Sequence, residues 1–377
     1  MIALDQDLSL TQSRDMLGNS TIGAALRMTF RLQPLLLSHF AILLLAVSVP
    51  TNLQAFAGCS VKPTSSLVVN VRDRGAKGDG KTDDTAAIQR AIDEIAGTGG
   101  TVYIPDGTFM VQGTGKTLRL GSKMTLKLAD RAVLKVIPTA APQYTTLRIV
   151  KATDVTVIGG TLHGDRKEHK GKKGEWGMGI HIGSEAARVA IVGVTSRNML
   201  GDGFYVSGVV DVALCSVSAI NNRRQGLSII EANRVLVTNS LFRDTHGTRP
   251  SAGIDMEPNK PDQSITNVRI EHSKFINNAG DGILIASKKG RVANVEIRGN
   301  LFDGNDQPIL VENAPGVRST AICGNRLVAR QEKPKQNLNA YAEPVQVVAP
   351  QIDCHEGSDM RFEKNRFTKK KRPKAGN

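Results

Sequence analysis

The chain has 377 residues, of which 40% are hydrophobic and 22% charged, and it contains four cysteines. A polypeptide with this much apolar side chain buries a sizeable core, so whole-chain disorder and a small cysteine-stapled fold are both excluded. Lys and Arg exceed Asp and Glu by fourteen, and five of these positive charges lie in the last ten residues. The rest of the chain keeps a charge of about +9, which favours anionic partners.

An apolar run near the N-terminus, Leu35 to Val49, is typical of a secretory signal. It is shorter than the roughly 20 residues that a membrane-spanning helix needs. Arg31 precedes it and Ala55-Phe56-Ala57 follows it, which completes a signal that begins at Met28. The sequence therefore predicts cleavage after Ala57 and a secreted or periplasmic product with no transmembrane segment. A lipoprotein anchored through Cys59 is the less favoured alternative, because this cysteine lies far behind the apolar run.

Export implies an oxidising compartment in which cysteines pair. Of the four cysteines, Cys323 and Cys354 are the expected partners. Cys215 lies in an alternating, strand-like run, and we interpret it as a small core residue. None of the four has the spacing of a metal site.

A repeat of roughly 25 residues runs through the middle of the sequence, a period that indicates a solenoid. Each unit holds Val-x-Val or Val-x-Ile, followed by Phe or Leu seven residues after its first position. The pairs are Val235 and Phe242, Val268 and Phe275, Val295 and Phe302, and Thr320 and Leu327. A second landmark is a glycine that opens a short alternating strand, at Gly179, Gly203, Gly226, Gly253 and Gly282. Shortly before the next unit lie residues expected to turn the chain with positive φ, namely Asn198, Asn222, Asn278 and Asn305.

Short strands in units of this length leave no room for the helices of βαβ crossovers. The chain must coil directly, so that each unit stacks on the one before and buries its inward Val, Ile, Leu and Phe in a continuous column. The predicted fold is a parallel β-helix. We expect a signal peptide over 1–57, a linker over 58–67, an N-terminal cap with the first strands over 68–110, the β-helix over 111–367 and a basic disordered tail over 368–377.

Two stretches near the start of this region carry a family resemblance. They are 75–93, which begins Gly-Ala-Lys-Gly-Asp-Gly, and 99–109, Gly-Gly-Thr-Val-Tyr-Ile-Pro-Asp-Gly-Thr-Phe. Together they resemble the N-terminal segment of the pectate lyase, rhamnogalacturonase A/B and epimerase-like superfamily, also called pectin lyase-like. With the repeats, the resemblance covers about residues 68–330. It implies an all-β, single-stranded right-handed parallel β-helix with an N-terminal capping helix.

The residues themselves agree with a helix over about 85–95. Asp83 or Asp84 would cap it, Gly97 and Gly99 would end it, and one face is apolar through Ile88, Ala91, Ile92 and Ile95. Such a helix would cover the open end of the solenoid.

Alternation along the Gly-led strands decides which side chains leave the core. One outward column would hold His181, Tyr205, Ser228, Asp255 and Leu284. A second, two positions further along, would hold Gly183, Ser207, Ile230, Glu257 and Ala286. Asp255 and Glu257 would thus be two carboxylates on one face, about 6.7 Å apart at Cα by the strand rise. They are the sharpest chemical feature of the sequence.

The loops beside this strand are the longest, and loops over a rigid sheet are where clefts form. We therefore expect carboxylates, a histidine and cations to converge around one turn, with aromatic rings that stack on sugars. The expected catalytic residues are Asp255, Glu257, His246, Arg249, His181 and Tyr205. The expected substrate-binding residues are Lys260, Ser228 and Trp176.

Three activities would use such a set. An inverting glycoside hydrolase needs a protonated and an ionised carboxyl about 6.5–9.5 Å apart. A lyase must neutralise a uronate carboxylate, remove the adjacent proton and protonate the leaving oxygen. Ca²⁺ held by Asp255 and Glu257, or Arg249 or Lys260, would serve the first need, while a histidine or Tyr205 would move the protons. The third activity is binding without turnover.

Motifs of the superfamily match only in part. The nearest match to the Gly-His-Gly of polygalacturonases is His246-Gly247, and only Asp255 matches the Asp-Pro-His-Asp of alginate lyases and epimerases. The positive charge favours an acidic polysaccharide, and the signal segment and lack of a nucleic-acid motif argue against nucleic acid. We therefore predict cleavage of a uronate-containing polysaccharide by β-elimination. A rhamnogalacturonase- or polygalacturonase-like hydrolase and a non-catalytic glycan-binding adhesin are the alternatives; the oligomeric state stays open.

Overall fold

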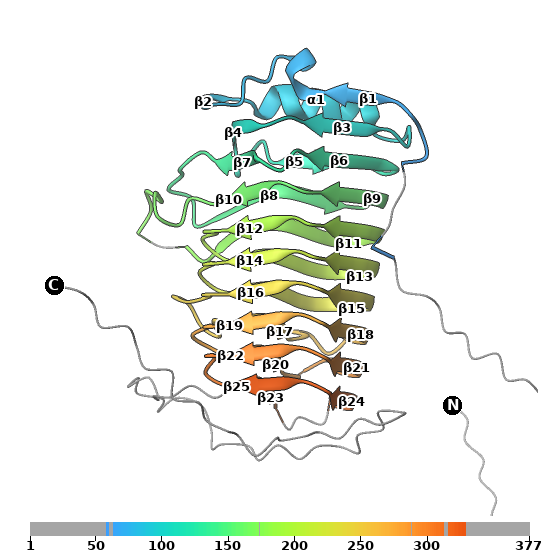
Figure 1. Ribbon diagram of the computed structural model, residues 1–377, viewed down its shortest axis with the longest axis vertical. Helices are drawn as coiled ribbons and strands as arrows, with labels where there is room; N and C mark the ends of the chain where they lie inside the picture. Colours follow the sequence, from blue (N-terminus) through green and yellow to red (C-terminus); the bar gives the residue numbers. More distant parts are fainter. Residues whose placement is uncertain (1–57, 60–62, 173, 288, 313–315, 329–377) are drawn as a thin grey trace, which may run out of the picture. The chain divides into compact units, whose positions relative to one another are not determined.

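The structure, a computed structural model, describes residues 58–59, 63–172, 174–287, 289–312 and 316–328. Within these ranges the chain forms an α-helix, a 3-10 helix and 25 strands, and all strand pairings are parallel. Successive turns stack along one axis (Figure 1). The part of the chain described is thus an all-β parallel solenoid, as the repeat predicts.

The strands form two sheets. The ten-stranded sheet contains β2 (Asp79–Asp83), β4 (Gly107–Val111), β7 (Ala132–Val136), β10 (Thr161–His163), β12 (Thr195–Arg197), β14 (Ser218–Ile220), β16 (Leu241–Arg243), β19 (Lys274–Ile276), β22 (Leu301–Asp303) and β25 (Arg326–Val328). The 15-stranded sheet contains β1 (Val68–Asn70), β3 (Thr101–Ile104), β5 (Leu118–Leu120), β6 (Met124–Leu128), β8 (Gln143–Val150), β9 (Thr153–Ile158), β11 (Trp176–Val192), β13 (Phe204–Cys215), β15 (Leu227–Thr238), β17 (Ile254–Met256), β18 (Ser264–Glu271), β20 (Ile283–Ile285), β21 (Arg291–Arg298), β23 (Ile309–Val311) and β24 (Val317–Cys323).

The larger sheet divides into two faces, because the long strands β11, β13 and β15 pass through register shifts midway along their length. The first face consists of β5, β8, the first parts of β11, β13 and β15, and then β17, β20 and β23. We call it the β5–β23 face. The second face consists of β1, β3, β6, β9, the last parts of the long strands, β18, β21 and β24.

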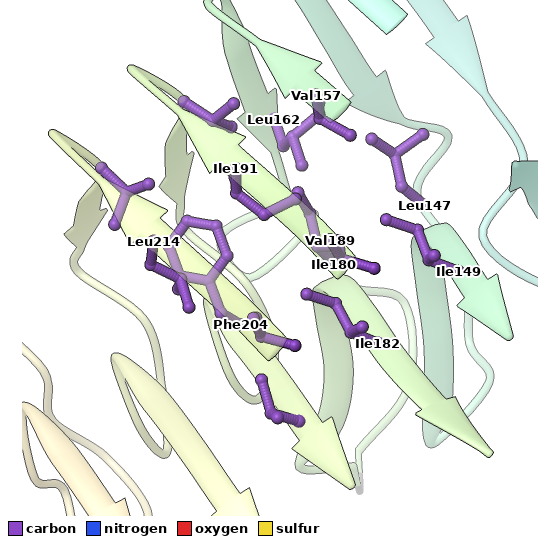
Figure 2. Close-up of a cluster of buried hydrophobic side chains, with 14 of the residues drawn as sticks. Leu147, Ile149, Val157, Leu162, Ile180, Ile182, Val189, Ile191, Phe204 and Leu214 are labelled. Atoms are coloured by element: carbon purple, nitrogen blue, oxygen red, sulfur yellow. The ribbon is translucent and has the colours of Figure 1, made fainter. Parts of the chain in front are cut away.

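Inward side chains fill one core that runs through the stack. Figure 2 shows a section in which Leu147 and Ile149 of β8 and Ile180 and Ile182 of β11 lie with Phe204 of β13. The repeat places its apolar residues as predicted: Val235, Val268 and Val295 are buried on successive turns. The Phe275 ring stacks between Phe242 and Phe302, with centroids 5.2 and 4.8 Å away.

The asparagines do not all turn the chain as predicted. Asn198 has the expected positive φ of 54°, but elsewhere the residue just before the asparagine takes this conformation, for example Asn221 at 54° and Asn277 at 53°. Asn222 and Asn278 are instead buried, and their side-chain oxygens accept backbone N–H groups. They satisfy polar groups that a stacked turn would otherwise leave unpaired.

The helix expected over 85–95 is α1 (Thr85–Ile95), which packs against η1 (Val71–Arg74), β1, β3 and β5. Its apolar face is fully buried through Ile88, Ala91, Ile92 and Ile95. Asp83 Oδ1 accepts a hydrogen bond from the Thr85 N–H at 3.0 Å, whereas Asp84 accepts the N–H groups of Lys77 and Gly78. That α1 acts as the cap of the solenoid stays a prediction.

The cysteines differ from the sequence-based expectation. Cys215 is not an isolated core residue, because its sulfur is bonded to Cys59 across a sequence separation of 156 residues. Cys354 lies outside the described residues, so its pairing with Cys323 stays a prediction. The signal over 1–57 and the tail over 368–377 also lie outside them. No helix in the described ranges is long and apolar enough to cross a bilayer.

Candidate functional site

The outward column predicted from alternation is present on the β5–β23 face. His181 pairs in register with Tyr205, Tyr205 with Ser228, Ser228 with Asp255, and Asp255 with Leu284. The structure extends the column by two turns, because Arg148 of β8 is the neighbour of His181 and Arg119 of β5 is the neighbour of Arg148. Along the stack the column therefore runs from cations, through a histidine and a tyrosine, to a carboxyl group and leucine.

A groove of about 560 Å³ lies over the first part of this column. Arg148, Trp176, His181 and Tyr144 are among its lining residues. A smaller hollow of about 340 Å³ adjoins it, lined by Arg119, Leu120, Arg148, Val150 and Lys151. Arg148 lines both, so three cationic side chains border one concave surface. The larger volume is typical of a small-molecule site.

His181 and Tyr205 contact each other in this groove region, edge to face, with ring centroids 5.2 Å apart. Burial, and then the charge of Arg148, lowers the pKa of His181 to about 4. Its imidazole is therefore neutral at neutral pH and able to accept a proton. Burial, and then the carboxylate of Asp202, raises the pKa of Tyr205, which keeps its phenol protonated. The pair thus offers one proton acceptor and one proton donor.

Trp176 is 41% exposed at the edge of the groove, and a buried ion pair lies beneath it. The Arg224 guanidinium carbon is 4.1 Å from the centroid of the indole ring. Arg224 also donates to both carboxylate oxygens of Asp202, each at 3.0 Å. Ser228 donates its hydroxyl proton to the same carboxylate at 2.9 Å and is fully buried. Ser228 is therefore part of the support below Trp176, and its predicted contact with substrate is wrong because no surface of it is accessible.

Asp255 departs most from the expectation of an open carboxylate pair. Its side chain points away from the central core, yet the residue is only 2% exposed. Its Oδ2 accepts from Gln225 Nε2 at 2.9 Å, and Gln225 Oε1 accepts from the Ala252 N–H. Ala252, Leu284 and Ala286 form a second apolar cluster, so the loop before β17 folds over the sheet here. Burial, and then Glu257, raises the pKa of Asp255 well above its usual range.

The second outward column is also interrupted. Gly183 pairs with Ser207 as expected, but Ser207 pairs with Glu231 and not with Ile230. A bulge at this point adds one residue to β15, so Ile230 drops out of the column; it is 5% exposed, while its neighbour Ile229 packs in the central core. Glu257 lies one turn further, half-buried, with its N–H donating to the Ile229 carbonyl.

Three further predicted residues lie in exposed loops apart from the groove. His246 Nδ1 is 2.8 Å from the Asp244 carbonyl oxygen, and the Lys260 N–H donates to Gln263. Arg249 is exposed. Within the described residues no hydrogen bond or ion pair joins any of the three to Asp255 or Glu257. The expected convergence around the β17 turn therefore stays a prediction. The backbone of His246 instead bonds to other turns, since its N–H donates to the Asn222 carbonyl and its own carbonyl accepts from Arg166.

Calcium at Asp255 and Glu257 does not fit the residues present. Calcium takes six to eight oxygen ligands. Asp255 is buried beside the positive charge of Arg224, and one of its oxygens is already bound to Gln225. The described ranges contain no group of three or more His, Cys, Asp or Glu side chains placed to hold a metal ion.

Four residues of this region were not predicted. The sequence could have predicted Arg119 and Arg148, because Leu118-Arg-Leu and Leu147-Arg-Ile have the same alternation as the Gly-led strands. It could not have predicted Asp202 and Arg224, since they precede the strands in turns, where alternation says nothing about direction. The ion pair between them forms only because consecutive turns stack.

The comparisons with known proteins agree with this architecture. A family model described as rhamnogalacturonase A/epimerase, pectate lyase-like, matches residues 68–127, and one described as right handed beta helix region matches 155–322. The matched residues, 68–127 and 155–322, thus belong to these pectin lyase-like, right-handed β-helix families, as the N-terminal segment and the repeats indicated.

Relatives and solved structures sharpen this assignment. The uncharacterized protein YclG of Bacillus subtilis is 27% identical over 70% of this chain and 49% of its own length. Mannuronan C5-epimerase AlgE3 of Azotobacter vinelandii is 28% identical over 58% and 14%, and alginate lyase 7 of the same organism is 67% identical over 12% and 5%. The chain thus spans half or less of the length of these relatives. The Streptococcus pneumoniae surface adhesin PfbA has the same fold, with a TM-score of 0.52 and 18% identity over 69% of this chain and 79% of the adhesin.

Proposed function

We propose that the protein binds an acidic polysaccharide along the β5–β23 face and cleaves it by β-elimination at a uronate. The observation that carries this proposal is the register of Arg148, His181 and Tyr205 on adjacent strands, where Arg148 and His181 line the groove and the Tyr205 ring contacts His181. A cation, a neutral base and a protonated phenol are the three groups that elimination next to a carboxylate requires. Successive turns place them about 4.8 Å apart along the stack.

The first requirement is to neutralise the uronate carboxylate. Arg148 lies beside His181 and lines both hollows, so its guanidinium is placed to bind that carboxylate. Neutralisation makes the hydrogen on the neighbouring carbon, C5, more acidic, because the negative charge that develops there spreads into the carboxyl group. Arg119 and Lys151 border the same surface and would bind acidic groups on adjoining sugars.

The second requirement is a base and an acid on the scissile residue. His181, neutral because of its lowered pKa, takes the proton from C5. The electron pair of that C–H bond forms the C4–C5 double bond, and the bond between C4 and the glycosidic oxygen breaks. Tyr205 gives its phenolic proton to the departing oxygen, and solvent returns a proton to Tyr205 and removes one from His181. The step is balanced with no other reactant.

Trp176 would hold the sugar ring during this reaction. Its indole is the large aromatic surface at the rim of the groove, and Arg224 and Asp202 fix it from below. Stacking on the apolar face of a pyranose orients the ring without a charge of its own.

Two other activities have support from particular observations. Epimerisation shares the first proton abstraction and differs only in returning a proton to C5, and mannuronan C5-epimerases are among the relatives. Binding without turnover is favoured by the structural likeness to an adhesin. Hydrolysis is favoured less, because one of its two carboxyl groups, Asp255, is buried.

The test is to incubate the protein with polymannuronate, polyguluronate and polygalacturonate, and with a neutral cellulose oligosaccharide as control. Elimination gives ultraviolet absorbance from the new double bond conjugated with its carboxylate, on an acidic polymer only. If deuterium from heavy water enters C5 and the chain is not cleaved, the reaction is epimerisation and not elimination. New reducing ends without absorbance would mean hydrolysis, and binding with none of these signals would overturn the proposal of an enzyme.

We also propose that the protein is exported. The predicted signal and the disulfide between Cys59 and Cys215 support this, because disulfides persist in oxidising compartments. A lipid anchor would need the Cys59 sulfur for a thioether, and that sulfur is bonded to Cys215. Mass spectrometry of the mature protein should find a chain that begins at Gly58, without lipid. Retention of residues 1–57 would contradict cleavage.

A further inference from the structure

The last described turn of the stack presents an apolar cross-section. Within the described residues, β23, β24 and β25 each pair with only one strand. These partners are β20, β21 and β22 of the preceding turn. Their inward side chains are only partly buried: Ile309, Val311, Val317, Ile322 and Leu327. The equivalent side chains one turn earlier are almost completely buried, as for Ile283, Ile285, Ile297 and Phe302. An open strand edge over an apolar core must be covered, since otherwise it pairs with other chains.

A ladder of side chains leads up to the same edge. The Ser240 N–H donates to Ser273 Oγ, and the Ser273 N–H donates to Asn300 Oδ1 on the next turn. The Asn300 N–H donates in turn to Asn325 Oδ1 at 2.9 Å. Asn325 is the last member of this ladder in the described part of the chain. The ladder position is five residues after the first valine of each repeat, so it can be located in the sequence alone.

The sequence beyond Val328 contains the same pattern once more. Residues 360–367, Met-Arg-Phe-Glu-Lys-Asn-Arg-Phe, have apolar residues at the first, third and eighth positions and asparagine at the sixth. Residues 295–302, Val-Glu-Ile-Arg-Gly-Asn-Leu-Phe, have the same order, and so do 320–327, Thr-Ala-Ile-Cys-Gly-Asn-Arg-Leu, except that threonine takes the first place. Residues 344–347, Pro-Val-Gln-Val, likewise repeat 308–311, Pro-Ile-Leu-Val, which contain β23.

We propose that residues 344–367 form one further turn and cover the edge of β23, β24 and β25. In the register of the preceding turns, Phe362 follows Ile322, Phe367 follows Leu327 and Asn365 follows Asn325. The outward positions are polar in this register: Arg361 and Glu363 follow Ala321 and Cys323, which pair in turn with Glu296 and Arg298. The inward positions extend the stack that contains the rings of Phe275 and Phe302.

The segment is long enough to do this. A turn takes 27 residues from Val268 to Val295 and 25 from Val295 to Thr320, and 40 residues separate Thr320 from Met360. The surplus is taken up by loops before and after 344–347, as the loops beside β17 lengthen that turn. The run of four consecutive basic residues, 369–372, begins only after Phe367, so the charged tail would start where the last turn ends.

The test compares inward with outward positions in the full-length protein. Phe362→Asp and Phe367→Asp place a carboxylate against the apolar cross-section and should each lower the midpoint of thermal unfolding by several degrees. Arg361→Asp and Arg366→Asp, in the same segment but facing outward, should leave it nearly unchanged. Hydrogen exchange should find the amides of residues 360–363 protected in the wild type. Phe362→Asp should remove the protection of these amides and reduce the protection of the amides in β24.

Two results would overturn the proposal. One is rapid exchange of the amides of residues 355–368 in the wild type, because a strand paired with β24 would be protected. The other is a dimer, seen by light scattering, whose dissociation on dilution exposes β24 to exchange, since a second copy would then cover the edge. The test holds even if a variant fails to fold, because the wild-type exchange pattern alone distinguishes a paired from an unpaired segment.

Discussion

The two halves of the β5–β23 face obey one register but differ in what they offer to solvent. In the half from β5 to β13, the outward side chains of Arg148 and His181 line an open groove, and Tyr205 lies next to His181. In the half from β15 to β23, Ser228, Asp255 and Leu284 point the same way and are buried under loops. Pointing away from the core is therefore not the same as being exposed. The loops decide whether an outward column becomes a binding surface or a second, outer core.

The largest loss of activity that tests the difference between the two halves is expected from a substitution of His181. His181→Ala should reduce the initial rate of double-bond formation on an acidic polymer by about 10²–10⁴-fold, because it removes the base. The unfolding midpoint should change little, since the residue lies at the surface of the sheet. Lys274→Ala, on an exposed position of β19, serves as the control. An unaltered rate in the His181 variant would show that the groove is not the active site.

Arg148 should follow, with a smaller loss. Arg148→Ala removes the guanidinium that we assign to the uronate carboxylate, and we expect a fall of about 10–100-fold in kcat/KM, in line with one charge-assisted hydrogen-bonding pair. Arg148→Lys should recover part of it, because the charge remains while the two-pronged geometry is lost. Arg291→Ala, an exposed arginine of β21, is the matched control. Equal losses in the Ala and Lys variants would point to structure and not to charge.

The pH dependence of the rate distinguishes a buried from an exposed histidine. Since the pKa of His181 is lowered to about 4, the imidazole stays unprotonated as the pH falls from 7 toward that value. The rate should therefore persist through mildly acidic pH and decline only near pH 4. A decline centred near the ordinary histidine pKa of about 6.5 would show that His181 is not held as the structure describes.

The pH dependence of the unfolding midpoint tests the burial of Asp281, which lies in the half of the face from β15 to β23. Burial, and then Asp306, raises its pKa to about 7 in the folded chain, above its usual value. The folded state therefore binds more protons than the unfolded one between these two values, so this group's stabilising contribution is complete at low pH and is lost as the pH rises through about 7. Asp281→Asn should flatten that dependence and raise the unfolding midpoint slightly at pH 8. Unfolding curves with the same pH slope in both proteins would contradict this.

The smallest effect is expected at Asp255. Asp255→Asn keeps an acceptor for Gln225 and replaces a carboxyl group whose pKa is raised by burial. Turnover and the unfolding midpoint should stay close to those of the wild type. A large loss of turnover would show that the covered half opens during the reaction and would move the active site toward β17.

The sequence contains enough to predict the stack but not its exposed surface. Val235, Val268 and Val295 and their partner phenylalanines reveal the period, and alternation then places Tyr205 and Asp255 in one column, because backbone geometry fixes both. Alternation cannot show that Ala252 folds over Asp255, nor that β15 gains a residue at Ile230, since both depend on loops and bulges with no periodic signal.

Long-range partners were equally beyond the sequence. Arg224 and Asp202 are 22 residues apart and meet only because consecutive turns stack. Their meeting follows from the register, but the direction of a side chain in a turn does not. The partner of Cys215 could not be deduced either, because four cysteines allow three connectivities.

The bond between Cys59 and Cys215 also makes the first half of the solenoid a closed ring of chain. A protease that cuts one peptide bond between these two residues would leave both fragments attached, and they would separate only when a reductant is added. In a surrounding rich in secreted proteases, a nick in the loop that carries His169 or in the turns around Arg119 would thus leave the groove's walls covalently joined.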